Sequence, residues 1–160
     1  MDIYNASATL PPEDFAAFTN TPRKVIIKPP GALYRFATII SPTFEGSRTF
    51  DSPWWIPPRT FRRITKAAYR SNKSIIAVAR EGLAVLPAWN PAMDWLIIVE
   101  LKQPVYGWIG PARRQWLPSR ERPGFLPGNY VQAYVPGLAP KDATSSQAAM
   151  LTYYGSADGE

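Results

Sequence analysis

WLIIVEL, residues 95–101, is a nearly continuous apolar run and predicts a central, buried β-strand. LYRFATII at 33–40 is rich in aromatic and β-branched residues, and YVQAYV at 130–135 alternates in hydrophobicity, so both are also expected to be strands. Shorter strands are expected at 23–28 and 105–109. Strands are therefore predicted in both the N-terminal and the C-terminal half of the sequence.

Two amphipathic helices are predicted between these strands, at 60–70 and 73–86. The second helix is expected to be capped by Ser71 or Asn72 and to stop at Pro87. The inward face of the first helix consists of Phe61, Ile64 and Ala68. Strands, two helices and then strands is the order of an α+β domain, with a small mixed or antiparallel sheet and the helices packed against it.

A chain of 160 residues is long enough for one domain with its own core. We expect an N-terminal arm at 1–22, a single α+β domain at 23–140 and a loosely held, flexible tail at 141–160. No basic region precedes an apolar segment at the start, and no apolar window reaches the length of a membrane span. The expectation is a cytoplasmic chain, or a domain delivered by a non-classical route, without a membrane partner.

The chain contains no cysteine and no histidine. This composition excludes disulfides, cysteine nucleophiles, thiolate metal sites and every catalytic couple that depends on imidazole. Catalysis must then use Arg, Lys, Asp, Glu, Gln, Ser, Thr, Tyr or backbone groups, and no metal site is expected. The 18 prolines favour short strands and turns over long helices.

The net charge of +6 favours an anionic ligand, nucleic acid or an anionic membrane surface, although extra arginines also simply keep a small protein soluble. One basic cluster has no intervening acid and consists of Arg59, Arg62, Arg63, Lys66, Arg70 and Lys73. A second group consists of Arg113, Arg114, Arg120 and Arg122. Because no signature of a nucleic-acid-binding fold accompanies them, nucleic acid is the less favoured partner.

Arg35 is a fixed cation in the middle of an early strand. A guanidinium on a partly buried sheet face requires an anionic partner, and phosphate or carboxylate would bind it through two hydrogen bonds. The alternative is an arginine that reaches solvent or pairs with Glu100 or Asp94. Residue chemistry alone weighs these two interpretations evenly.

Gln132 lies at the centre of the alternating strand and shares its face with Tyr130 and Tyr134. An amide between two tyrosines can hydrogen-bond a polar ligand without carrying charge. Taken alone, a half-exposed structural glutamine is the more common explanation.

The loop at 41–58 combines large aromatic residues with small hydroxyl residues, a mixture that suits a flat heteroaromatic ring with polar edges. Its members are Phe44, Phe50, Trp54, Trp55, Ser47, Arg48, Thr49 and Ser52. Since tryptophan usually fills space in a core, we expect one tryptophan to pack and the other to form a pocket wall.

Three segments taken together resemble the TNT (tuberculosis necrotizing toxin-like) NAD glycohydrolases, relatives of the ADP-ribosyltransferase fold. These are Arg35-Phe36, IVELKQPVYGWIGPA at 98–112 and PGNYVQAYV at 127–135. The similarity covers about 33–136, with gaps. It departs from the family where the turn before the glutamine has less glycine, where Tyr34 replaces the usual Asp, and where Tyr134 replaces the glutamate of the wider pattern. The missing glutamate favours hydrolysis over transfer.

The resemblance implies a toxin-like, metal-independent NAD glycohydrolase of ADP-ribosyltransferase-like fold, with NAD as substrate and no other cofactor. It implies that Gln132 is the catalytic glutamine, which orients ribose or water, and that Arg35 anchors the pyrophosphate. The resemblance adds Phe36 as the aromatic residue beside that arginine. Residue chemistry adds the other expected substrate-binding residues, which are Arg48, Ser52, Trp54, Trp55, Tyr130 and Tyr134. An immunity-type protein inhibitor is an expected partner.

Two other functions stay open. One is a cyclase or isomerase with an aromatic-lined pocket that acts on a small hydrophobic substrate. The other is a non-catalytic basic module that binds nucleic acid or a protein partner.

Overall fold

The computed structural model describes residues 5, 8–38, 52–118 and 124–138, and the backbone alone of 143–150. The larger sheet has the order β1 (Arg23–Ile27), β5 (Val105–Pro111), β8 (Val131–Tyr134) and β3 (Trp54–Trp55). The smaller sheet has the order β2 (Ala32–Ala37), β4 (Trp95–Leu101) and β9 (Ala143–Met150). A short hairpin joins β6 (Gln115–Trp116) to β7 (Phe125–Leu126). Within these residues every strand pairing is antiparallel, so the α+β expectation is confirmed in its antiparallel form.

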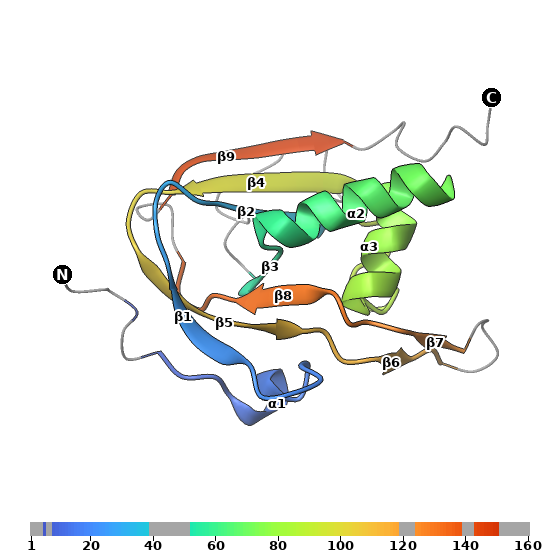
Figure 1. Ribbon diagram of the computed structural model, residues 1–160, viewed down its shortest axis with the longest axis horizontal. Coiled ribbons are helices and arrows are strands. Elements are labelled where there is room, and N and C mark those ends of the chain that lie inside the picture. Colours follow the sequence, from blue (N-terminus) through green and yellow to red (C-terminus); the bar gives the residue numbers. More distant parts are fainter. Residues whose placement is uncertain (1–4, 6–7, 39–51, 119–123, 139–142, 151–160) are drawn as a thin grey trace.

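Figure 1 shows β2, β4 and β9 as an upper layer and β5 and β8 as a lower one. The helices are α1 (Pro12–Phe15), α2 (Pro58–Ser71) and α3 (Ile75–Leu83). In the view of Figure 1, α2 and α3 lie on the right of the molecule and α1 lies below the lower layer. None of the helices in the described ranges is both long and apolar enough to cross a membrane.

The apolar run at 95–101 forms β4, the middle strand of the smaller sheet, as predicted. Its alternate residues Ile97, Val99 and Leu101 face a core between the two sheets, and on the other face Leu96 packs against the core under the helices. The between-sheet core consists of Leu33, Trp55, Ile97, Val99, Leu101, Val105, Ala133, Val135 and Leu138. One face of β4 is therefore covered fully and the other in part, so its one charged residue, Glu100, lies at the exposed position.

The second core lies under α2 and α3 and receives Phe36 from β2. In α2 the predicted inward residues Ile64 and Ala68 are buried. The start of α3 differs from the prediction: Ser74 caps it, and its Oγ accepts a hydrogen bond from the Ala77 amide at 2.9 Å. Asn72 instead ends α2 in the left-handed conformation, with φ of 55°, so the break between the helices falls later than the sequence indicates.

Residues 143–150 lie in the segment expected to be a flexible tail, but their backbone forms β9. This strand pairs with β4 from Trp95 opposite Met150 to Leu101 opposite Ala143, with a register shift near the end. The second edge of β4 would otherwise present unpaired amides and carbonyls. Backbone pairing of this kind leaves little trace in a sequence of Ala, Ser and Thr.

The N-terminal arm also packs onto the domain. Phe18 is fully buried and forms a bridge with Ala112 next to β5. The side chain of Asn5 donates to the Tyr106 carbonyl at 3.0 Å and accepts from the Tyr106 amide at 2.8 Å. Phe18 finds room because Gly110 has no side chain: a Cβ there would lie 3.1 Å from the Phe18 ring.

The carboxyl end of α3 holds the turn that leads into β8. The amides of Gly128 and Tyr130 donate to the carbonyls of Glu81 and Gly82 at 2.9 and 3.0 Å. The Tyr130 ring then lies directly on Gly82, where a Cβ would come within 2.6 Å of the ring. A helical glycine is required here because the ring occupies the space of a side chain.

We predict that Gly82→Ala lowers the free energy of unfolding by about 1–3 kcal/mol, because the new methyl group collides with the Tyr130 ring. In a Tyr130→Ala background the same change should be neutral or stabilising by up to about 1 kcal/mol, since alanine favours helix over glycine. Urea unfolding of the four proteins of this cycle measures both effects. Equal destabilisation in both backgrounds would contradict the close contact.

Candidate functional site

A cavity of about 380 Å³ lies where the two sheets, the end of α3 and the segment around α1 meet. Six residues expected at the site line it: Arg35, Phe36, Ser52, Trp54, Trp55 and Gln132. They come from β2, from β3 and the residues before it, and from β8, so the lining belongs to both sheets. Its volume lies within the range of about 300–1,000 Å³ that is usual for small-molecule sites.

The Arg35 guanidinium lies against an aromatic wall of this cavity. Its carbon is 4.3 Å from the centre of the Trp55 ring, and its Nη1 donates to the Ser52 carbonyl at 2.9 Å. Trp55 is itself 1% exposed, so the ring is a rigid support. These contacts hold the cation in one orientation on a half-buried sheet face, which suits recognition of a fixed anion.

Gln132 is held by the N-terminal segment. Its Nε2 donates to the Ala17 carbonyl at 3.1 Å, and its amide oxygen accepts no hydrogen bond from the described part of the chain. The predicted alternation of the strand is confirmed, because Ala133 and Val135 enter the between-sheet core on the opposite face. Gln132 therefore offers its amide oxygen to the cavity, while one of its two amide N–H groups is occupied by Ala17.

Two carboxylates also line the cavity, Glu13 and Asp14 from α1. Burial raises the pKa of Tyr134 to about 12, assisted by a hydrogen bond with Asp14 and by the negative charges of Asp14 and Glu13. Sequence reasoning missed these acids because they lie in the segment assigned to an arm, far along the chain from Gln132. Two acids that follow prolines form no local sequence pattern that would mark a functional site.

The two tyrosines that flank Gln132 in sequence do not line the cavity. Tyr134 is buried against Trp54 and Trp108, at ring-centre distances of 5.0 and 6.1 Å. Tyr130 precedes the strand, follows Asn129 with its φ of 77°, and packs under the Arg63 guanidinium on another face. Because the positive φ breaks the strand alternation, Tyr130 leaves the face of Gln132. Arg48 lies outside the described residues.

The segment between α3 and β4 supplies a further wall with Trp89, Asn90 and Met93. The Asn90 side chain donates to the Phe36 carbonyl at 2.9 Å and accepts from the Thr38 hydroxyl. Trp89 is 62% exposed, and an exposed tryptophan beside a cavity is typical of a binding site. Sequence reasoning did not single out this segment.

Arg80 holds that segment in place from inside α3. Its guanidinium donates to the carbonyls of Val85, Asn90 and Pro91 at 2.9–3.0 Å. Burial lowers the pKa of Arg80 below its ordinary value. The cation acts as a structural clamp on the cavity wall.

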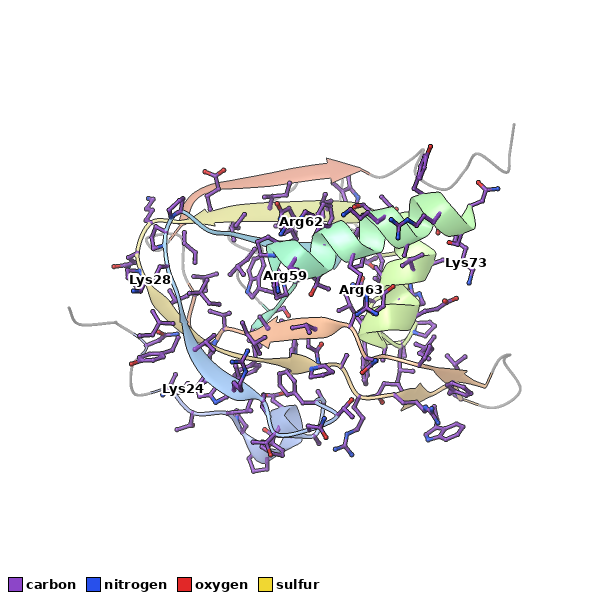
Figure 2. The ribbon with its side chains drawn as sticks, in the orientation of Figure 1. Lys24, Lys28, Arg59, Arg62, Arg63 and Lys73 are labelled. Atoms are coloured by element: carbon purple, nitrogen blue, oxygen red, sulfur yellow. The ribbon has the colours of Figure 1, made fainter. Side chains whose placement is uncertain are left out.

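The described residues contain no group of three or more carboxylate, imidazole or thiol side chains that could hold a metal ion. The charged groups that do line the cavity are Glu13, Asp14, Arg35 and Arg113. Because cationic and anionic side chains both line the cavity, it suits a ligand that carries charges of both signs. Figure 2 shows the side chains of the described residues in the same orientation as Figure 1.

No protein-family model matches this chain, and no curated protein matches it. Two solved structures contain similar chains. A chain from the structure of Tne2 in complex with Tni2 is 16% identical, with a TM-score of 0.48, over 82% of this chain and 94% of that one. A chain from Rhs1-CT in complex with its cognate immunity protein RhsI1 is 12% identical, with a TM-score of 0.50, over 85% and 86%. At 12% identity, the similarity to the chain from the Rhs1-CT structure is a similarity of fold. Both structures are complexes with a partner protein.

The raised pKa of Tyr134 leads to a prediction about alkaline stability. The unfolded tyrosine releases its proton near pH 10, while the folded one keeps it until about pH 12, so the free energy of unfolding falls as the pH rises through this window. At pH 11 this group accounts for a loss of about 1 kcal/mol relative to pH 8.

Tyr134→Phe should remove that part of the alkaline loss, whereas Tyr69→Phe should keep it because Tyr69 is 90% exposed. Urea unfolding at pH 8 and pH 11 measures the difference. If the two variants lose the same stability between these pH values, Tyr134 does not titrate as described.

Proposed function

We propose that this chain is a toxin-like NAD glycohydrolase of ADP-ribosyltransferase-like fold, which cleaves the bond between nicotinamide and ribose. One observation carries the proposal: Arg35 and Gln132, on different sheets, line the same cavity together with Phe36 and Trp54. The resemblance to the TNT enzymes assigns Arg35 and Phe36 to substrate binding and Gln132 to catalysis, and Trp54 is a candidate wall for nicotinamide by its residue type. The hydrophobic patterns of the separate strands do not by themselves predict that these residues line one cavity.

In this proposal the substrate is bound by its charge and its flat ring. The pyrophosphate takes hydrogen bonds from the Arg35 guanidinium, whose carbon lies 4.3 Å from the centre of the Trp55 ring. The cationic nicotinamide ring lies against Phe36 or Trp54, since an aromatic face attracts a cation. The charged lining also favours NAD over the small hydrophobic substrate of a cyclase or isomerase.

The reaction breaks the bond between ribose C1′ and the nicotinamide nitrogen, and the electron pair leaves with nicotinamide. The ribose passes through an oxocarbenium-like state, to which a water oxygen adds while its proton goes to solvent. The products are nicotinamide, ADP-ribose and one proton. Gln132 orients the ribose hydroxyls or the water through its amide oxygen, and the hydrogen bond from one of its N–H groups to the Ala17 carbonyl fixes the side chain. Orientation and electrostatics replace the absent histidine.

Asp14 supplies the negative charge that the wider ADP-ribosyltransferase pattern takes from its last strand. That position holds Tyr134 here, and the Asp14 carboxylate lines the cavity and helps to raise the pKa of Tyr134. An anion at this place stabilises the developing positive charge on ribose. The acid thus comes from α1 instead of from β8.

An immunity-type protein inhibitor belongs to the same proposal. The Rhs1-CT structure includes a cognate immunity protein, and the Tne2 structure includes its partner Tni2. An enzyme that consumes NAD would deplete the cell that makes it, so we propose that a partner protein keeps this chain inactive there.

We predict that the purified chain releases nicotinamide and free ADP-ribose from NAD, as measured by chromatography. Gln132→Ala should lower kcat by about 100-fold or more, because it removes a group that orients the transition state. Arg35→Ala should act mainly by raising KM, because it removes binding to the pyrophosphate. Arg23→Ala, an exposed arginine on β1, is the matched control and should behave as the unmodified chain. No nicotinamide release, or full activity in both site variants, would end the proposal.

Asp14→Asn should lower kcat by about tenfold or more with little change in KM, since it removes charge and keeps shape. Glu13→Gln removes the same charge one residue away and should have a smaller effect. Thermal unfolding of both variants checks that α1 stays docked. Unchanged kcat in Asp14→Asn would exclude the carboxylate from the reaction.

A further inference from the structure

We propose that one face of α2 binds single-stranded nucleic acid through its phosphodiester backbone. This face, here named the cationic stripe, consists of Arg59, Arg62, Arg63, Lys66 and Arg70. Figure 2 labels Arg59, Arg62 and Arg63 along the helix. The inference is independent of NAD hydrolysis, because the stripe and the cavity share no lining residue.

The spacing of the stripe places its five cations on one side of the helix. They follow one another at intervals of one, three or four residues, and all are exposed, whereas Thr60, Ile64 and Ala68 occupy the buried side. From Arg59 to Arg70 the stripe is about 16 Å long, at 1.5 Å per residue. Its side chains and Tyr130 line an open hollow of about 550 Å³. An open hollow lined by cations suits a polyanion.

The charge of the stripe is not balanced within the described structure. Helix α2 contains no acidic residue, and the salt bridge recorded among the described residues joins Lys73 to Glu81 at 3.6 Å, beyond the stripe. Like charges three or four residues apart destabilise a helix. An external anion would relieve this repulsion.

Aromatic side chains stand at both edges of the stripe. Tyr130 lies under the Arg63 guanidinium at 4.0 Å, and Tyr69, which is 90% exposed, follows Lys66 by three residues. Four of the five cations are arginines, whose planar fork matches phosphate. Cations that follow a backbone and exposed rings that stack on bases are the features of single-strand binding. An acidic protein surface would have no comparable use for the exposed Tyr69 ring.

The test measures the fluorescence anisotropy of a labelled, mixed-sequence, single-stranded DNA of about 20 nucleotides. If five phosphates are neutralised, the logarithm of affinity should fall with the logarithm of salt with a slope of about −3.5, so affinity drops about 100-fold between 50 and 200 mM salt. Absence of binding at 50 mM salt would overturn the proposal.

Arg62→Gln with Lys66→Gln should weaken binding and reduce the magnitude of the slope by about 1.4. The matched control is Arg23→Gln with Lys28→Gln, which removes the same charge from exposed positions of β1 and its end that do not line the hollow. Tyr69→Ala should weaken binding about tenfold or more with an unchanged slope, because it removes stacking rather than charge. Equal losses in the stripe variant and the control would show only a response to net charge and would overturn the site.

Unlabelled poly-L-glutamate, at matched charge, distinguishes phosphate from carboxylate recognition. Poor displacement of the labelled strand supports the phosphodiester assignment, and displacement as effective as by unlabelled DNA overturns it. Nicotinamide release by the stripe variants should equal that of the unmodified chain, which separates this proposal from the catalytic one.

Discussion

The apolar layer between the two sheets is the constraint on which the rest of the structure depends. Trp55 lies in that layer at 1% exposure, pairs through its backbone with Ala133 of the larger sheet and supports Arg35 of the smaller one. Burying such a ring stabilises the fold strongly, and it also sets the distance between the sheets. The cavity exists where this layer ends and the side chains of both sheets become accessible.

The chemistry of the cavity depends on the segments that surround it. The segment around α1 contributes acids and the carbonyl that holds Gln132, and α3 contributes the wall clamped by Arg80. The segment around α1 is docked by the contact of Phe18 with Gly110. The turn from α3 into β8 is docked by the contact of the Tyr130 ring with Gly82. The site is consequently rigid on several sides, which suits a reaction that depends on orientation.

The positive charge of the chain has two different roles in this arrangement. In the cavity, Arg35 and Arg113 share the wall with two carboxylates, so the local charge is mixed and the ligand must match it. On α2 the cations stand together without a carboxylate. The net charge of +6 therefore describes neither the cavity nor the surface of α2. The fold places cations beside carboxylates in the cavity and cations without carboxylates on α2.

The sequence by itself determined the position of β4, the buried sides of α2 and the two faces of β8, because periodic burial is encoded residue by residue. It also determined that any catalysis proceeds without imidazole or thiol. Tertiary structure alone decided that Asp14 stands near Gln132, that Tyr130 turns away from it and that β9 completes the smaller sheet. These outcomes depend on contacts between distant segments and on one positive φ angle, and neither leaves a periodic pattern in the chain.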